Sequence, residues 1–149
     1  MKIVFLVASL ICTINSAFAD VLPKDSPELT QLEAMGYDIE PAKTNAYWTI
    51  ARSSTAVILI SKNSERTVLT RSFTRKQGLS ETEELALLRI VNKINADLSF
   101  QVNISSSGLN YNLYNFGVYD PKTFAKVVRI MEKADNTFNT YSEIMRLIK

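Results

Sequence analysis

Apolar residues recur at alternating steps of three and four from Phe124 to the end of the chain, which is the most regular pattern in the sequence. The series starts just after Asp120, a capping residue, and Pro121, which suits the first helical position. Such spacing places the apolar side chains on one face of a helix. We therefore predict one helix from Pro121 to the end. Its apolar stripe consists of Phe124, Val127, Met131, Ala134, Phe138, Tyr141, Met145 and Ile148.

Capping signals predict two further helices. Ser26 and the proline after it open a short helix that runs to about Met35, where Gly36 suits the left-handed conformation that ends helices. Ser80 and Glu83 form a capping box, in which each side chain binds the free backbone amide of the other residue. The helix after this box is expected to bury one face. Its predicted apolar residues are Leu85, Leu88, Val91 and Ile94, with Leu87 beside them.

Runs of β-branched and aromatic residues predict strands, three before the second helix and two after it. Short polar connections, such as residues 105–108, are typical of hairpins, so neighbouring strands are expected to run antiparallel. The predicted order is α-β-β-β-α-β-β-α, an α+β fold with a mainly antiparallel sheet packed by helices. The predicted strands are residues 47–50, 56–60, 67–73, 98–104 and 109–116.

The N-terminal pattern differs from the others, because apolar residues run almost unbroken for about a dozen positions. Lys2 precedes this run, and Ala17 and Ala19 follow it with the spacing of small residues that a signal peptidase recognises. We therefore interpret residues 1–19 as a signal peptide and expect the mature chain to begin at Asp20. The apolar run is shorter than the roughly 20 residues that span a bilayer, so no stable membrane insertion is expected after cleavage.

The leader predicts export, either to the periplasm of a Gram-negative cell or by secretion. Residues 20–149 have the size of one ordinary domain that can bury its own core. The one cysteine of the chain, Cys12, lies inside the leader. No disulfide is therefore expected in the mature protein, and packing must supply its stability.

Composition narrows the chemistry. The chain has no histidine, which is the usual general base and a frequent metal ligand. Its formal net charge is only +2, so no nucleic acid is implied as a partner. The densest acidic group, residues 81–84, occupies the first turn of a predicted helix, where the helix dipole favours negative side chains. We expect no catalytic residues, no metal site and no cofactor, and hence a non-enzymatic protein.

Basic residues cluster along and after the third predicted strand. Arg66, Arg71, Arg75 and Lys76 lie near Phe73, a mixture that also occurs on surfaces that bind nucleic acid. The export signal argues against that role. We interpret them as solvated side chains of a strand edge, where positive charge discourages pairing with another sheet.

Two sets of residues are candidates for binding a partner protein. Trp48, Tyr111 and Tyr114 would form an aromatic binding face if they point outward, whereas alternation along strands would place about half of such residues in the core. The stripe of the final helix is typical of a seam that pairs with a second copy, and equally of packing on the chain's own sheet. Its candidate interface residues are Phe138, Tyr141 and Met145.

Several short motifs follow one another in a characteristic order, and a pair of asparagines, Asn92 and Asn95, is the most telling part. Helix-end hydrogen bonds are the structural explanation for such a pair. The motifs are Gly36 with Tyr37, Trp48 with residues 57–60, residues 87–95 with Phe100, Gly108 with Leu109, and residues 120–124. In their order and spacing the chain resembles the YbjN-like family, whose domain is similar to type III secretion chaperones.

The resemblance implies a non-enzymatic protein-binding module, commonly dimeric in the chaperones and linked to regulation or stress responses in the family. Those relatives are largely cytoplasmic, so the leader sets this chain apart. Our leading hypothesis is an exported binding protein that engages another polypeptide or a second copy of itself as a homodimer. The alternatives are a periplasmic inhibitor or immunity-type protein, and a carrier of small apolar ligands held between sheet and helices.

Overall fold

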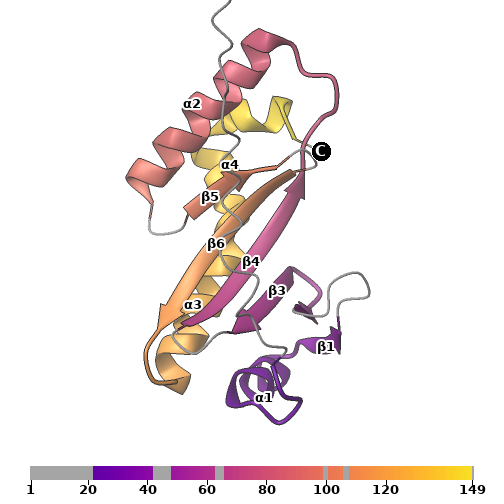
Figure 1. Ribbon diagram of the computed structural model, residues 1–149, viewed down its shortest axis with the longest axis vertical. Helices are drawn as coiled ribbons and strands as arrows, with labels where there is room; N and C mark the ends of the chain where they lie inside the picture. Colours follow the sequence, from indigo (N-terminus) through magenta and orange to yellow (C-terminus); the bar gives the residue numbers. More distant parts are fainter. Residues whose placement is uncertain (1–21, 42–47, 63–65, 99–100, 106–107, 149) are drawn as a thin grey trace, which may run out of the picture.

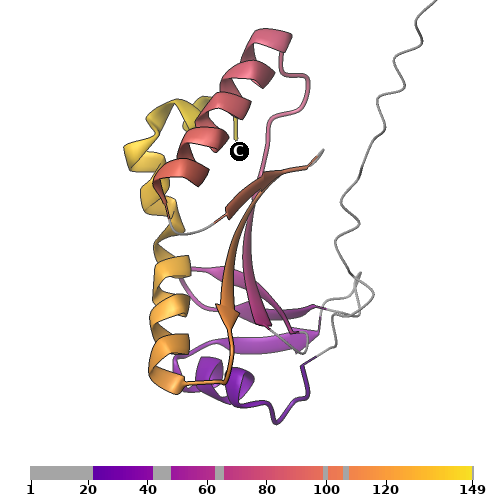
Figure 2. The same ribbon diagram turned by 60° about the vertical axis from the view of Figure 1, so that its left-hand side comes forward.

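The computed structural model of the chain is an antiparallel sheet with helices against one face (Figure 1, Figure 2). It describes residues 22–41, 48–62, 66–98, 101–105 and 108–148, apart from the side chains of Pro41, Phe138 and Asn139. The predicted signal peptide, with its cleavage residues, lies outside the described residues. Within the described ranges, none of the helices combines the length and the apolar character needed to cross a membrane.

The sheet is six-stranded, and each neighbouring pair of strands runs antiparallel in the order β1-β2-β3-β4-β6-β5. The α+β class is confirmed. β1 is a strand that the sequence pattern did not indicate, because its aspartate and proline are poor strand formers. The strands are β1 (Asp38–Pro41), β2 (Thr49–Arg52), β3 (Val57–Lys62), β4 (Arg66–Thr74), β5 (Gln101–Ile104) and β6 (Gly108–Phe116).

The helices begin at the residues that the capping signals predict. The Ser26 hydroxyl accepts the N–H of Leu29 at 3.3 Å, and the Asp120 carboxylate accepts the N–H of Thr123 at 2.7 Å. The second helix carries both hydrogen bonds of the predicted capping box. The helices are α1 (Pro27–Ala34), α2 (Glu81–Asp97), α3 (Pro121–Glu132) and α4 (Asn136–Thr140), with the 3-10 helices η2 (Lys133–Asp135) and η3 (Ser142–Arg146).

The prediction of one continuous helix to the end of the chain is wrong. The long helix ends at Glu132, and the chain continues through η2, α4 and η3. Asp135, Asn136 and Thr137 are poor helix formers, and the guanidinium of Arg71 binds the last carbonyl groups of α3. Beyond the break, Ala134 and Ile148 of the stripe are buried, whereas Met145 of η3 is 56% exposed. The regular spacing therefore predicted burial correctly for part of the stripe only, and helix continuity wrongly.

The predicted apolar face of α2 is rotated relative to the observed one. Leu85 and Leu88, which were expected to be buried, are 48% and 49% exposed. Leu87, which lies between them in sequence, is fully buried, so the two exposed leucines face away from β5 and η3, the elements on which α2 packs. The buried side chains of α2 are Leu87, Ile90, Val91 and Ile94.

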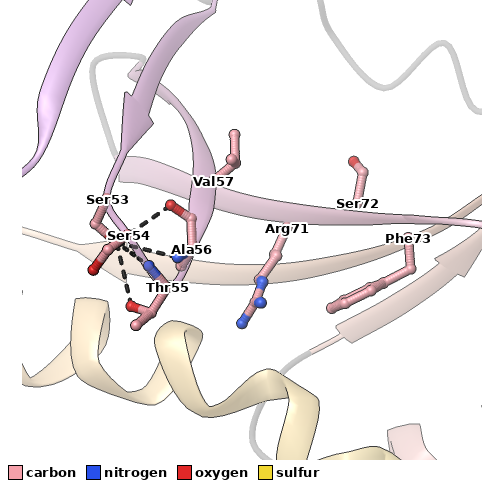
Figure 3. A pocket seen from close by; sticks show the side chains of 8 residues that line it. All are labelled: Ser53, Ser54, Thr55, Ala56, Val57, Arg71, Ser72 and Phe73. Carbon is pink, nitrogen blue, oxygen red and sulfur yellow. Dashed lines mark hydrogen bonds between the residues drawn. The ribbon is translucent and has the colours of Figure 1, made fainter.

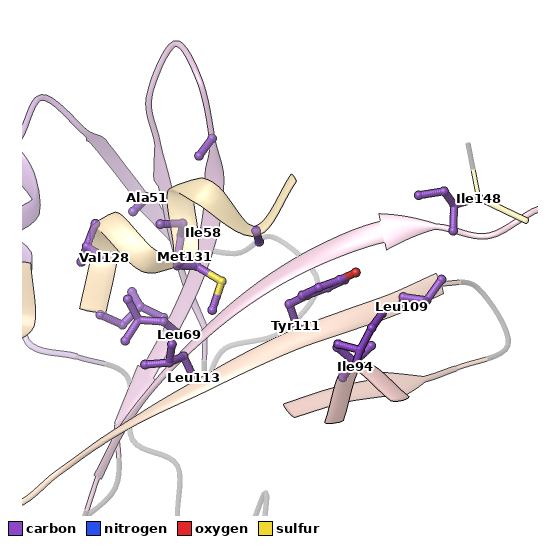
Figure 4. Packing of buried hydrophobic residues seen from close by; sticks show 14 of the residues in the cluster. Ala51, Ile58, Leu69, Ile94, Leu109, Tyr111, Leu113, Val128, Met131 and Ile148 are labelled. Atoms are coloured by element: carbon purple, nitrogen blue, oxygen red, sulfur yellow. The ribbon is translucent and has the colours of Figure 1, made fainter. Parts of the chain in front are cut away.

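The core lies between the sheet and α3, where Leu69, Leu113 and Met131 meet (Figure 4). Tyr111 is fully buried there, and its ring meets the ring of Phe73 edge to face at 5.1 Å between centroids. Tyr111 therefore belongs to the core.

Asn95 ties the end of α2 to β5. Its Nδ2 donates to the carbonyl oxygen of Val102 at 3.0 Å, and the N–H of Val102 donates to its Oδ1 at 2.6 Å. Asn92, like Asn95, is an exposed residue. The expected helix-end role is confirmed for Asn95, which positions the strand that follows.

Candidate binding surfaces

The sheet face opposite the helices carries apolar side chains from β2, β3, β4 and β6. Alternation along each strand puts the core residues on one face and their neighbours on the other. In the described part of the chain no helix covers this second face (Figure 2). The side chains in the band are half-buried, except Phe116, which is 64% exposed. We name this set the apolar band: Ile50, Leu59, Val68, Tyr114 and Phe116.

The outer end of the apolar band is aromatic and carries a positive charge. Val68 lies opposite Tyr114 in the β4–β6 register, and Arg66 lies opposite Phe116. The guanidinium carbon of Arg66 is 4.7 Å from the centroid of the Tyr114 ring, and the rings of Tyr114 and Phe116 lie 6.1 Å apart. Aromatic residues with an arginine are the composition typical of protein interfaces.

Hydroxyl and amide side chains pair across the strands beside the apolar band. The hydroxyl of Thr70 donates to the amide oxygen of Asn112 at 2.7 Å, and the hydroxyl of Ser72 donates to that of Asn110 at 2.7 Å. Such cross-strand pairs hold β4 and β6 in register. The surface next to the apolar band is therefore polar and rigid.

The three predicted aromatic residues do not form one face. Tyr111 is buried in the core, so it cannot contact a partner in this fold. Tyr114 belongs to the apolar band, and its hydroxyl donates to Gln101 on β5 at 3.2 Å. Trp48 is half-buried and directly precedes β2. The next residue, Thr49, is buried and faces the core. Alternation places Trp48 on the same side of the strand as Ile50, at the far end of the apolar band.

The three candidate residues of the terminal stripe do not lie on one helix. Tyr141 falls in the bend between α4 and η3, and its hydroxyl donates to the carboxylate of Asp97 at 2.7 Å. This hydrogen bond raises the pKa of Tyr141 above its ordinary value. Met145 is 56% exposed on η3. The side chain of Phe138 lies outside the described residues. Its predicted place in a pairing seam therefore stays a prediction.

The interpretation of the basic residues as a solvated strand edge is wrong, because β4 is a central strand. Arg71 is only 8% exposed. Its Nη1 donates to the carbonyl oxygens of Met131 at 3.3 Å and Glu132 at 2.7 Å, and its Nη2 binds the carboxylate of Asp135 at 2.6 Å. A cation at this position complements the negative end of the α3 dipole. Arg71 thus fixes where the last long helix ends.

The other basic residues of this cluster also have structural partners. The side chain of Arg75 forms an ion pair with Glu84 at the start of α2. The backbone of Arg75 bridges to Ile148, and the N–H of Lys76 donates to the carbonyl oxygen of Leu147 at 3.0 Å. The end of β4 therefore holds the C-terminal segment in place.

Two buried polar pairs link α1 and its following loop to the rest of the fold. Glu28 is 1% exposed. Its Oε1 accepts a hydrogen bond from Lys62 Nζ at 2.6 Å and another from the Thr67 hydroxyl at 3.4 Å. The hydroxyl of Tyr37 donates to the carboxylate of Glu132 at 2.7 Å. Burial, and then this hydrogen bond, raise the pKa of Tyr37 far above its ordinary value.

A hollow of about 340 Å³ opens between the start of β3 and the end of β4 (Figure 3). The β2–β3 turn and two residues of β4, Arg71 and Phe73, surround it on the helix side. Polar and apolar groups share its lining about equally, so a ligand with both kinds of group fits it better than a purely apolar one. The lining residues are Ser53, Ser54, Thr55, Ala56, Val57, Arg71, Ser72 and Phe73. Sequence patterns did not indicate this hollow, because it depends on where two strands separate.

Of the acidic residues at the start of α2, Glu83 belongs to the capping box and Glu84 pairs with Arg75. Hydrogen bonds from the backbone and the hydroxyl of Ser80 lower the pKa of the Glu83 carboxyl. Among the described residues, no group of three or more cysteine, aspartate or glutamate side chains converges to hold a metal ion.

Comparisons with known proteins find no matching family model, no matching curated protein and no matching solved structure. The candidate surfaces are therefore judged from the chain's own residues.

Proposed function

We propose that this chain is an exported, non-enzymatic protein-binding module of the YbjN-like type, with a chaperone-like or regulatory role. The single observation that carries the proposal is the apolar band on the helix-free sheet face, with Phe116 exposed at its end. Exposed large apolar side chains in a contiguous patch mark interaction surfaces on soluble domains. The partner is a polypeptide, either another protein or a second copy of this chain.

The geometry of the apolar band suits a protein partner. Strands held by cross-strand hydrogen bonds present its side chains on a rigid surface, so little conformational entropy is lost when a partner docks. Tyr114 and Phe116 supply large aromatic contact areas, and the Arg66 guanidinium stacked on Tyr114 supplies donors at the rim. These are the residue types that dominate binding energy in interfaces.

Site-specific photo-crosslinking in the producing cell tests the proposal. A photoreactive phenylalanine analogue replaces Phe116 in the apolar band, and a matched control carries it at Lys126, an exposed position of α3 on the opposite face. We expect a discrete, protease-sensitive adduct from position 116 and none from position 126. The mass of the adduct distinguishes a second copy of the chain from a different protein.

A second variant asks whether the adduct depends on the surface. Replacing Tyr114 by serine removes the ring between Val68 and Phe116, and we expect this change to weaken the adduct formed at position 116 several-fold. Equal adducts from positions 116 and 126, or none from either, would count against the proposed function.

A further inference from the structure

Among the described residues, one edge of β4 has no neighbouring strand along part of its length. β4 pairs with β6 along all nine of its residues, from Arg66 to Thr74. On its other side it pairs with β3 only from Thr67 to Thr70. The β3 register would next place Ile58 opposite Arg71 and Val57 opposite Ser72, but these residues pair with β2 and turn away from β4. The hollow of Figure 3 opens at this separation.

The C-terminal segment occupies the same edge further along. The N–H and C=O of Gly108 form hydrogen bonds with Ser105, on the β5 side of β6. Gly108 therefore exchanges no backbone hydrogen bonds with Thr74, its partner in the β4–β6 register, and the N–H and C=O of Thr74 face away from β6. Lys76, two residues later, has the same orientation, and its N–H donates to Leu147. The vacant stretch of β4 therefore lies between β3 on one side and the end of the chain on the other.

Ser72 is the central residue of this vacant stretch. Backbone orientation alternates along a strand, so Ser72 shares the orientation of Thr74 and directs its N–H and C=O away from β6. The stretch from Arg71 to Phe73, which ends before the bridge of Arg75 with Ile148, spans roughly 7–10 Å of extended chain. This length and the adjoining hollow match a short extended segment.

We propose that the vacant edge of β4 binds an extended, uncharged segment of a partner polypeptide as an added strand. This inference rests on the proposed function, since it names a second way in which a protein partner is held. The residue of the segment opposite Ser72 would exchange both backbone hydrogen bonds with it. Its neighbours along the segment would point into the hollow, beside Arg71 and Phe73.

The lining of the hollow determines which side chains fit. The charge of Arg71 is already balanced by Asp135 and by two carbonyl oxygens, so the hollow presents no unbalanced charge from Arg71. Phe73 contributes an apolar wall, and Ser53 and Thr55 contribute hydroxyl groups. Small apolar or hydroxyl side chains, such as valine, serine and threonine, are complementary to this lining.

A capped pentapeptide of the sequence valine-threonine-valine-serine-valine is the probe, added to the isotope-labelled mature chain and followed by amide NMR. Two N-methylated versions provide matched controls. The first is methylated at the residue that pairs with Ser72, so the N–H that would donate to the Ser72 carbonyl is removed. The second is methylated at the next residue, whose N–H points away from β4. We expect the first methylation to weaken binding about tenfold or more and the second to change it little.

The supporting result is a set of amide shifts centred on Ser72 and Thr74 that the first methylation abolishes. A bulky replacement at the mouth of the hollow, Val57→Trp, should also abolish these shifts, whereas the control Val57→Ile should preserve them. If Val57→Trp fails to fold, Thr55→Trp tests the same blockage. Shifts only at Val68, Tyr114 and Phe116 would overturn this inference and leave the proposed function standing. An absence of shifts at millimolar peptide would overturn it as well, while photo-crosslinking at position 116 judges the proposed function separately.

Discussion

The guanidinium of Arg71 in the central strand donates to the backbone carbonyl oxygen of Glu132, 61 residues later, at 2.7 Å. The bond joins β4 to the last carbonyl groups of α3, and the same side chain holds Asp135 just beyond the helix. A buried arginine thus sets the length of a helix that apolar spacing alone would have continued.

Replacing Arg71 by methionine keeps the apolar stem and removes these bonds. We expect the free energy of unfolding to fall by about 2–3 kcal/mol, because hydrogen bonds from a charged donor are lost and carbonyl groups are left without their partner. Urea denaturation measures the change. The matched control is Arg129→Met on the exposed side of α3, which should cost less than about 0.5 kcal/mol. An equal effect of the two changes would contradict the role given to Arg71.

Lys62 and Glu28 form a pair in which only the carboxylate is fully buried. Lys62→Met leaves the Glu28 carboxylate buried with the Thr67 hydroxyl as its remaining partner. We expect a loss of about 3 kcal/mol in the free energy of unfolding. The double variant with Glu28→Met should recover most of that loss, because the buried charge is gone.

Thermal and urea unfolding of both variants check this expectation. The exposed ion pair of Arg52 with Glu40 is the control, and Arg52→Met should cost less than about 1 kcal/mol. A double variant less stable than Lys62→Met alone would show that the buried charge is not the cause.

Alkaline pH is expected to destabilise the fold through Tyr37. Its pKa is raised in the folded state, so the neutral phenol is favoured there, and the stabilisation is complete below the unfolded value of about 10. It is lost progressively as pH rises above about 10. Absorbance titration should show fewer tyrosines ionising before unfolding than after it, and Tyr37→Phe should make the stability less dependent on pH. An unchanged pH dependence in Tyr37→Phe would contradict this cause.

Gly108 brings β6 close to β4. A Cβ atom at this position would lie 2.4 Å from the carbonyl oxygen of Phe73, and backbone in the middle of a sheet cannot easily move away. We expect Gly108→Ala to lower the free energy of unfolding by about 1–3 kcal/mol. Asn103→Ala on the exposed side of β5 is the control and should change the stability little. Calorimetry of both variants would decide the matter, and equal stabilities would contradict the expectation.

Much of the fold follows from local signals in the sequence. Ser26, Ser80 and Asp120 cap helices because their side chains bind free backbone amides within three residues, so short-range patterns suffice to find them. The strands follow from β-branched runs, apart from β1. The α+β class results from their order.

The parts that the sequence did not predict depend on contacts between distant segments. Apolar spacing does not reveal that Arg71 lies under the end of α3, since the two are brought together only by the sheet. Leu85 is exposed because it lies on the side of α2 that faces away from β5 and η3, which its own periodicity cannot indicate. The hollow beside Ser72 depends on the point at which β3 leaves β4. Of the candidate residues, Tyr114 was found from the sequence, whereas Phe116 was identified only from its exposed position.

The bridge between Arg75 and Ile148 bears on when this domain can form during synthesis. The end of β4 receives backbone partners from Leu147 and Ile148. The tertiary structure of the domain therefore stays incomplete until these residues have left the ribosome. The sheet edge at the end of β4 is therefore completed only late in synthesis.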